Sequence, residues 1–88
     1  TLGCINCKHN LPIYNRWQEK YAAKGLQIIG VHTPETSYEH SIPHVKESIA
    51  HWGIKYPVVF DGNSENWNRW KVEAWPSVYV VDKRGQIR

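Results

Sequence analysis

The spacing of apolar and polar residues predicts that helices and strands alternate along the chain. Between residues 8 and 25, apolar side chains recur every three or four positions and a glycine follows, which predicts a helix. A second such run spans residues 41–53, where Ser41 can cap the helix and Pro43 falls in its first turn. Ser64 can cap a third, shorter helix. The apolar positions of the three helices are Leu11, Tyr14, Trp17, Tyr21, Ile42, Val45, Ile49, Trp52, Trp67 and Trp70.

Three short apolar runs separate these helices, and each predicts a buried strand. They span residues 26–32, 57–60 and 77–81, and they are rich in β-branched side chains. Residues 82–85 predict a turn, after which residues 86–88 begin a strand that would pair antiparallel. The alternation predicts an α/β fold, with a mixed sheet and helices on both faces. We expect residues 1–88 to form a single domain.

The start of the chain suggests that this domain is a fragment. A helix that opens an α/β unit should be fed by a strand, and only three residues precede the first cysteine. We therefore expect a strand upstream of Thr1, central in the sheet, and more chain after Arg88. Because the first residue is not methionine, a signal peptide or an anchor ahead of it stays open.

The two cysteines of the sequence, Cys4 and Cys7, open the first predicted helix. The unpaired N–H groups and the dipole at a helix N-terminus stabilise a thiolate, which lowers the pKa of the thiol below its free value of about 8.5. The thiolate is the species that attacks a disulfide. Cys4 should face solvent and act as the nucleophile. Cys7 lies one turn inside, on the stripe of Leu11 and Tyr14, and should be the more buried, resolving thiol.

The cysteine pair could also be a structural disulfide or half of a four-sulfur zinc site. Such a zinc site needs a second cysteine pair, which the sequence lacks, and a disulfide across so short a loop would remove little chain entropy. Both cysteines and one histidine could still bind copper(I) or zinc, although the spacing matches no usual zinc signature. The alternatives to disulfide exchange are therefore a copper(I)- or zinc-binding chaperone and a redox-inert interaction module. The histidines are His9, His32, His40, His44 and His51.

Composition narrows the class of partner. The formal net charge is +3 and the isoelectric point is about 9.0, with basic and acidic residues interspersed. Without a basic run, the sequence gives no indication of nucleic-acid binding. No stretch approaches the roughly 20 apolar residues of a membrane-spanning helix. We expect neither an organic cofactor nor a metal, because the Cys4–Cys7 pair itself carries the electrons.

Several segments together resemble the thioredoxin superfamily. Within it, the chain is similar to the TlpA/ResA-like extracytoplasmic thiol–disulfide oxidoreductases, and to the thioredoxin-like domain of DipZ-type proteins. The resemblance covers nearly the whole chain and implies a thioredoxin-like fold. The segments that carry it are Cys4–Cys7, Pro12, Gly25–Val31, His32–Glu35, Gly53–Val58 and Val72–Ser77.

The resemblance implies an enzyme, a thiol–disulfide oxidoreductase whose catalytic residues are Cys4, Cys7 and Pro76. Residues 72–77 correspond to the cis-proline loop of the superfamily, so the bond before Pro76 is expected to be cis. Trp75 would place a large ring beside the disulfide. We expect this ring, together with Ile5 and Asn6 between the cysteines, to contact the substrate.

The resemblance also implies where the protein works and with what. Its substrates would be protein thiols and disulfides, and an upstream redox partner would recharge the cysteine pair. The expected location is extracytoplasmic, in the periplasm or cell envelope of a bacterial type of cell, with a membrane anchor or a fused domain allowed outside these residues. The Ile5-Asn6 pair lacks the histidine that marks strong oxidants among relatives, which favours a reducing or intermediate potential.

Proton handling has three candidates. Asn10 stands where many relatives carry a glutamate, so another group has to serve. His32 and Glu35 lie at the end of the first predicted strand, at the sheet edge where ligands of α/β folds bind. His9 lies two residues after the second cysteine. Each could relay a proton when the resolving thiol is deprotonated, against the simpler interpretation of an exposed or loop side chain.

Overall fold

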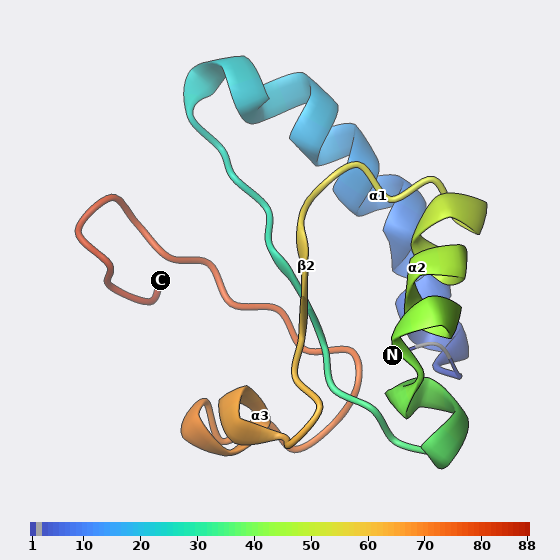
Figure 1. The fold of residues 1–88 in the computed structure, drawn as a ribbon. Coiled ribbons are helices and arrows are strands. Elements are labelled where there is room, and N and C mark those ends of the chain that lie inside the picture. The colour runs from blue at the N-terminus through green and yellow to red at the C-terminus, as the bar shows by residue number, and fades with distance from the viewer. Residues whose placement is uncertain (2) are drawn as a thin grey trace.

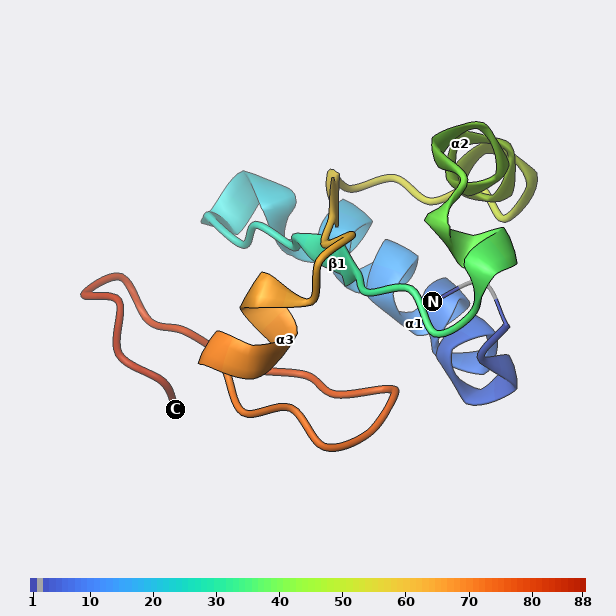
Figure 2. The ribbon, with the colours of Figure 1, turned by 60° about the horizontal axis from the view of Figure 1, so that its bottom comes forward.

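The computed structural model describes residue 1 and residues 3–88. Helices α1 and α2 lie to one side of two short strands, and α3 follows the end of β2 (Figure 1). In the turned view, α3 and the C-terminal segment come forward of β1 (Figure 2). In chain order the elements are α1 (Ile5–Tyr21), the 3₁₀ turn η1 (Ala22–Lys24), β1 (Gly30–His32), the 3₁₀ turn η2 (Ser37–His40), α2 (Ile42–His51), β2 (Val58–Phe60) and α3 (Glu65–Arg69).

Helices α1 and α2 begin and end where local sequence signals place them. Cys4 is the N-cap of α1, and Gly25, with a φ of 99°, ends the 3₁₀ turn that extends this helix. The Ser41 hydroxyl accepts the N–H of His44 at 3.4 Å as the N-cap of α2. Gly53, with a φ of 61°, follows α2, and such a left-handed conformation favours glycine. The structure confirms both predicted helices.

Ser64 is at the N-cap position of α3, as predicted, but its side chain does not cap the helix. Its φ is 58° and its side chain makes no capping hydrogen bond. The carboxylate of Asp61 takes this role instead, accepting the backbone N–H groups of Asn66 and Trp67, each at 3.0 Å. The same carboxylate accepts the hydroxyl of Thr33 at 2.8 Å, so it joins α3 to the residue that follows β1.

The sheet of the described residues consists of β1 and β2, paired in parallel with Gly30 opposite Val58. Both strands are shorter than predicted, and they lie where the first two apolar runs end. A side chain at Gly30 would bring its Cβ within 3.1 Å of the ring of Tyr56, so glycine allows the strand to lie close to that ring.

The third predicted strand is not part of this sheet. Residues 77–81 pair with neither β1 nor β2, and they contribute one antiparallel bridge, from Val81 to Ile87. The predicted turn is present, with the N–H of Gly85 donated to the carbonyl of Asp82 at 3.0 Å. A strand forms by pairing its backbone groups with a neighbour, which the apolar pattern alone does not supply. The α/β architecture is therefore present as a small parallel sheet with helices, without the predicted mixed sheet.

Few apolar side chains are buried. Among the described residues, Val45 and Tyr56 are the buried hydrophobic ones, and Trp52 and Trp70, two apolar positions of the predicted helices, are 43% and 42% exposed. A largely apolar cavity of about 640 Å³ lies between α1, β1 and residues 74–81. No helix in the described part of the chain has the length and apolar character that crossing a membrane requires.

Candidate active site

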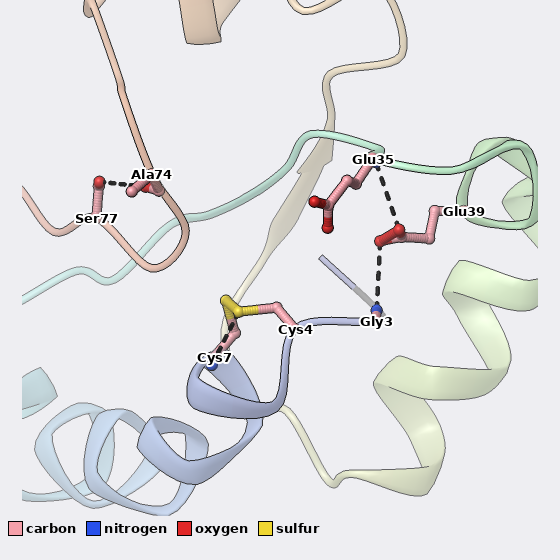
Figure 3. Close-up of a disulfide and its surroundings, with 7 residues drawn as sticks. All are labelled: Gly3, Cys4, Cys7, Glu35, Glu39, Ala74 and Ser77. Atoms are coloured by element: carbon pink, nitrogen blue, oxygen red, sulfur yellow. Dashed lines mark hydrogen bonds between the residues drawn. A yellow bond between two sulfur atoms is a disulfide. The ribbon is translucent and has the colours of Figure 1, made fainter.

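Cys4 and Cys7 form a disulfide at the N-terminus of α1, with their Cα atoms 5.2 Å apart (Figure 3). Cys4 has extended backbone dihedral angles, and its carbonyl accepts the N–H of Lys8 at 3.1 Å. Its Sγ atom accepts the N–H of Cys7 at 3.1 Å, which is the side-chain bond of an N-cap residue. The sulfur of Cys4 therefore lies at the positive end of the helix dipole, as predicted.

The two cysteines differ in their surroundings. Both are partly exposed, and the greater burial expected for Cys7 stays a prediction. Cys7 lines the large cavity, whereas Cys4 caps the helix beside it. A dipole and a directed N–H at the sulfur of Cys4 would stabilise a thiolate there once the disulfide is reduced.

The cavity gathers several residues that the sequence singled out. Cys7, His32, Trp75 and Pro76 all line it, although they come from three separate parts of the chain. The Trp75–Pro76 peptide bond is cis. The loop is closed by the hydroxyl of Ser77, which donates to the carbonyl of Ala74 at 2.6 Å (Figure 3).

Trp75 and the residues between the cysteines present different surfaces. The ring of Trp75 packs on that of Trp67, with centroids 4.0 Å apart, and remains partly exposed. Ile5 is 67% exposed in the first turn of α1, and Asn6 beside it is also exposed. An exposed apolar side chain adjacent to the disulfide can contact an incoming protein segment without rearrangement.

His32 is buried at the end of β1, 5% exposed, and stacks on Phe60. Its Nε2 atom is 2.9 Å from the backbone carbonyl of Glu39. Because a carbonyl only accepts, Nε2 carries the proton in this contact. Burial lowers the pKa of His32 from its ordinary value, which favours the neutral ring.

Glu35 and His9, the other two relay candidates, are exposed. Glu35 extends its carboxylate from the loop after β1 toward the disulfide (Figure 3). His9 lies on α1, outside the lining of the cavity. The structure therefore places His32 at the cavity, Glu35 on the side of the disulfide, and His9 away from the cavity.

Sequence reasoning missed Glu39, which is 1% exposed in η2. Its carboxylate accepts the N–H of Gly3, the residue before Cys4, at 3.3 Å (Figure 3). A Thr-x-x-Glu pattern, from Thr36 to Glu39, is a capping signal and could have drawn attention to this carboxylate. Within the described residues, no three His, Cys, Asp or Glu side chains gather as a metal-binding group.

A helix opened by a Cys-x-x-Cys disulfide, next to parallel strands, places the chain in the thioredoxin-like class of thiol–disulfide domains. The comparison with family models agrees, since residues 1–88 match the AhpC/TSA family. The chain belongs to the AhpC/TSA family.

Curated relatives are similar over almost the whole chain. It is 38% identical over 86 residues to Protein DipZ of Mycobacterium bovis, covering 98% of this chain and 12% of that protein. It is 30% identical over 88 residues to the thiol-disulfide oxidoreductase YkuV of Bacillus subtilis, covering 100% of this chain and 59% of that one. It is 29% identical over 84 residues to the thiol-disulfide oxidoreductase ResA of Bacillus thuringiensis, covering 96% of this chain and 46% of that protein. The chain thus spans between about an eighth and three fifths of these relatives.

Proposed function

We propose that this protein exchanges disulfides with protein partners through Cys4 and Cys7. The observation that carries the proposal is the disulfide at the N-terminus of α1, where the N–H of Cys7 is directed at the sulfur of Cys4. A helix N-terminus stabilises the thiolate that this chemistry requires. Similarity to two relatives that are named thiol-disulfide oxidoreductases supports the same class of reaction.

The reaction consists of two exchanges at sulfur. In the reducing direction, the Cys4 thiolate attacks a partner disulfide and forms a mixed disulfide, while the other partner sulfur leaves as a thiolate and takes up a proton. Cys7 then loses its proton and attacks Cys4, which closes the Cys4–Cys7 disulfide and releases the second partner thiol. Two electrons pass from the cysteine pair to the partner. The absence of a histidine in the Ile5-Asn6 pair favours this direction or an intermediate potential.

The surroundings of the disulfide suggest how a partner segment docks. Ile5 and Asn6 are exposed on the first turn of α1, and Trp75 and Pro76 border the cavity that reaches Cys7. We infer that an extended segment of the partner lies between these two surfaces. Glu35, exposed and directed toward the disulfide, is the group that we propose takes the proton of Cys7. His32 is neutral and hydrogen-bonded, and it borders the same cavity as an alternative.

The proposal extends to location and partners. We propose an extracytoplasmic protein of bacterial type, in which an upstream redox partner recharges the cysteine pair after each turnover. Protein thiols and disulfides are its substrates, and the pair works without an organic cofactor or a metal. The similarity to bacterial proteins named thiol-disulfide oxidoreductases supports this proposal.

The two single-cysteine variants test the roles of the sulfurs. Cys7→Ser should still attack a disulfide partner but fail to resolve the product, so mixed disulfides accumulate and disappear on adding reductant. Cys4→Ser should form few, because the remaining thiol lacks the N–H that stabilises Cys4. Each variant is expressed in an oxidising compartment and examined on non-reducing gels. Equal trapping by both variants would overturn the assignment of the nucleophile.

A metal titration of the unsubstituted protein separates the exchange reaction from the metal alternative. If the cysteines instead bind copper(I) or zinc, both are ligands and either substitution should weaken binding to a similar extent. Absence of trapping by either variant, together with tight copper(I) or zinc binding, would favour a chaperone. Absence of both trapping and metal binding would favour a redox-inert interaction module.

A further inference from the structure

The carboxylate of Glu39 is the most deeply buried one among the described residues, and it lies close to the Cys4–Cys7 disulfide (Figure 3). Only 1% of this residue is exposed, and an ionised carboxylate withdrawn from water is costly unless it is hydrogen-bonded. It accepts hydrogen bonds from the hydroxyl of Thr36 at 3.3 Å, the N–H of Glu35 at 3.4 Å and the N–H of Gly3 at 3.3 Å. Exchange chemistry at the cysteines uses none of these contacts directly.

Two of the three bonds are local and one is not. Thr36 and Glu35 belong to the turn that leads into η2, so their bonds to Glu39 stabilise that turn, as a capping box does. The bond from Gly3 joins residues 36 positions apart and serves no purpose within the turn. It attaches the backbone that enters α1 to η2.

The hydrogen bond from Gly3 to Glu39 bears on the disulfide because Gly3 immediately precedes Cys4. The backbone of Cys4 has a φ of −88° and a ψ of 104°, and its sulfur faces the N–H of Cys7. An N-cap residue needs such an extended conformation, and besides the bond to Glu39 the entering backbone is held by the N–H of Cys4, which donates to the carbonyl of Thr1 at 3.3 Å. A Cβ added at Gly3 would lie 3.7 Å from a carboxylate oxygen of Glu39, which is an ordinary contact distance. A small side chain therefore fits at Gly3 without displacing this carboxylate.

We propose that Glu39 is a positioning residue for Cys4. By accepting the N–H of Gly3, its carboxylate fixes the backbone that enters α1 and keeps the sulfur of Cys4 within reach of Cys7. The proposal rests on the proposed disulfide exchange and assigns to that site a part outside the Cys-x-x-Cys sequence. The effect expected is on the effective concentration of one thiol toward the other, which rises when two reacting groups are held together.

The negative charge of Glu39 and its hydrogen bond to Gly3 could each affect the disulfide, so the two effects have to be measured separately. The carboxylate of Glu35 and the side chains of His32 and His40 are the other titratable groups around it. Glu39→Gln removes the negative charge and keeps one accepting oxygen, which can still serve the N–H of Gly3, while its NH2 group replaces the oxygen that accepts the N–H of Glu35 and the hydroxyl of Thr36. Glu39→Ala removes both the charge and the acceptor. The difference between the two variants therefore reports the hydrogen bond.

The measurement is the equilibrium between the dithiol and the disulfide in glutathione buffers at pH 7. In this reaction oxidised glutathione takes two electrons from the cysteine pair and yields two reduced glutathione molecules. We expect Glu39→Ala to lower the equilibrium constant for closing the Cys4–Cys7 disulfide by about tenfold or more. Glu39→Gln should stay within about threefold of the unsubstituted protein. Glu47→Gln, which removes the charge of an exposed carboxylate on α2, is the matched control and should change nothing.

A second pair of variants tests the donor side of the same bond and does not depend on whether Glu39→Ala folds. Gly3→Pro removes the N–H that Glu39 accepts, whereas Gly3→Ala keeps it. We expect Gly3→Pro to lower the equilibrium constant as far as Glu39→Ala does, and Gly3→Ala to leave it within about threefold. Far-UV circular dichroism confirms that each variant retains its helices.

The outcomes distinguish this proposal from the proposed function. If the unsubstituted protein exchanges disulfides but Glu39→Ala and Gly3→Pro match it, the positioning role is overturned. If Glu39→Gln falls as far as Glu39→Ala, the charge or the bonds within the turn, rather than the bond to Gly3, are responsible, and the proposal is again overturned. If the unsubstituted protein itself shows no reversible exchange, the proposed function fails first.

Discussion

Replacing Asp61 by asparagine tests how the ends of the two strands are joined to α3. Asp61 is 4% exposed, and its carboxylate accepts the hydroxyl of Thr33 at 2.8 Å and two backbone N–H groups of α3 at 3.0 Å each. An asparagine side chain has nearly the same shape but keeps only one accepting oxygen. At least one N–H of α3 loses its partner, and the remaining bonds lose their charged acceptor.

The magnitude follows from the kind of bond that is lost. A hydrogen bond to a charged acceptor contributes about 1.5–3 kcal/mol, roughly twice as much as one between neutral groups. Losing one such bond and weakening the others should lower the free energy of unfolding by about 2–3 kcal/mol at pH 7. For a small domain, whose total stability is on the order of 5–15 kcal/mol, this is a large fraction.

The effect should depend on pH in a defined direction. Burial acts to raise the pKa of Asp61, but the hydrogen bonds from Asn66, Trp67 and Thr33 outweigh it and hold the pKa below its ordinary value. The folded state therefore binds fewer protons than the unfolded state. The stabilisation is fully present above the unfolded pKa of about 3.9 and is lost as the pH falls through the lower folded value. The difference between the two proteins should shrink over that range.

Urea unfolding followed by circular dichroism, at pH 7 and at steps down to pH 2, measures both effects. Glu65→Gln is the matched control, because Glu65 is an exposed acid in the first turn of the same helix. Its loss should cost less than about 1 kcal/mol. An Asp61→Asn variant within about 0.5 kcal/mol of the unsubstituted protein at pH 7 would refute the reasoning.

Two further predictions concern titration. Cys4 in the reduced protein should have a pKa below the free-thiol value, because its sulfur faces the N–H of Cys7 at a helix N-terminus; the rate of alkylation against pH measures this, and a midpoint at or above about 8.5 would contradict it. Burial lowers the pKa of His32 in the folded state, so the unfolded chain, with a pKa of about 6.5, binds the proton more readily. The free energy of unfolding should therefore fall as the pH falls below that value. The free energy of unfolding between pH 8 and pH 5 should fall less steeply in His32→Gln, and equal slopes would show that His32 is not responsible.

Local signals in the sequence predicted the local features of the structure. The helical spacing of apolar residues, the capping position of Ser41 and the glycines at 25 and 53 located α1 and α2, because each signal acts within one or two helical turns. The position of Cys4 at the start of α1 followed from the same reasoning. What could be predicted of the site was therefore the part that one helix determines.

Features that depend on distant contacts could not be predicted in this way. The run at residues 77–81 has the apolar character of a strand, but pairing decides whether a strand forms, and these residues pair with neither β1 nor β2. Ser64 was expected to cap α3, whereas Asp61 reaches the helix from the end of β2. The link between Glu39 and Gly3 joins two segments whose proximity no local pattern encodes.

The open apolar cavity beside β1 has a thermodynamic consequence. Val31, Val78 and Val80 line it and are 50%, 59% and 62% exposed in the folded state, so unfolding newly exposes half or less of their surface. The heat-capacity change of unfolding is set largely by newly exposed apolar surface and usually amounts to about 12–15 cal/mol/K per residue. With so few apolar side chains buried, these residues alone should give a smaller value and a flatter dependence of stability on temperature. A segment that filled the cavity would raise the heat-capacity change and restore the usual curvature.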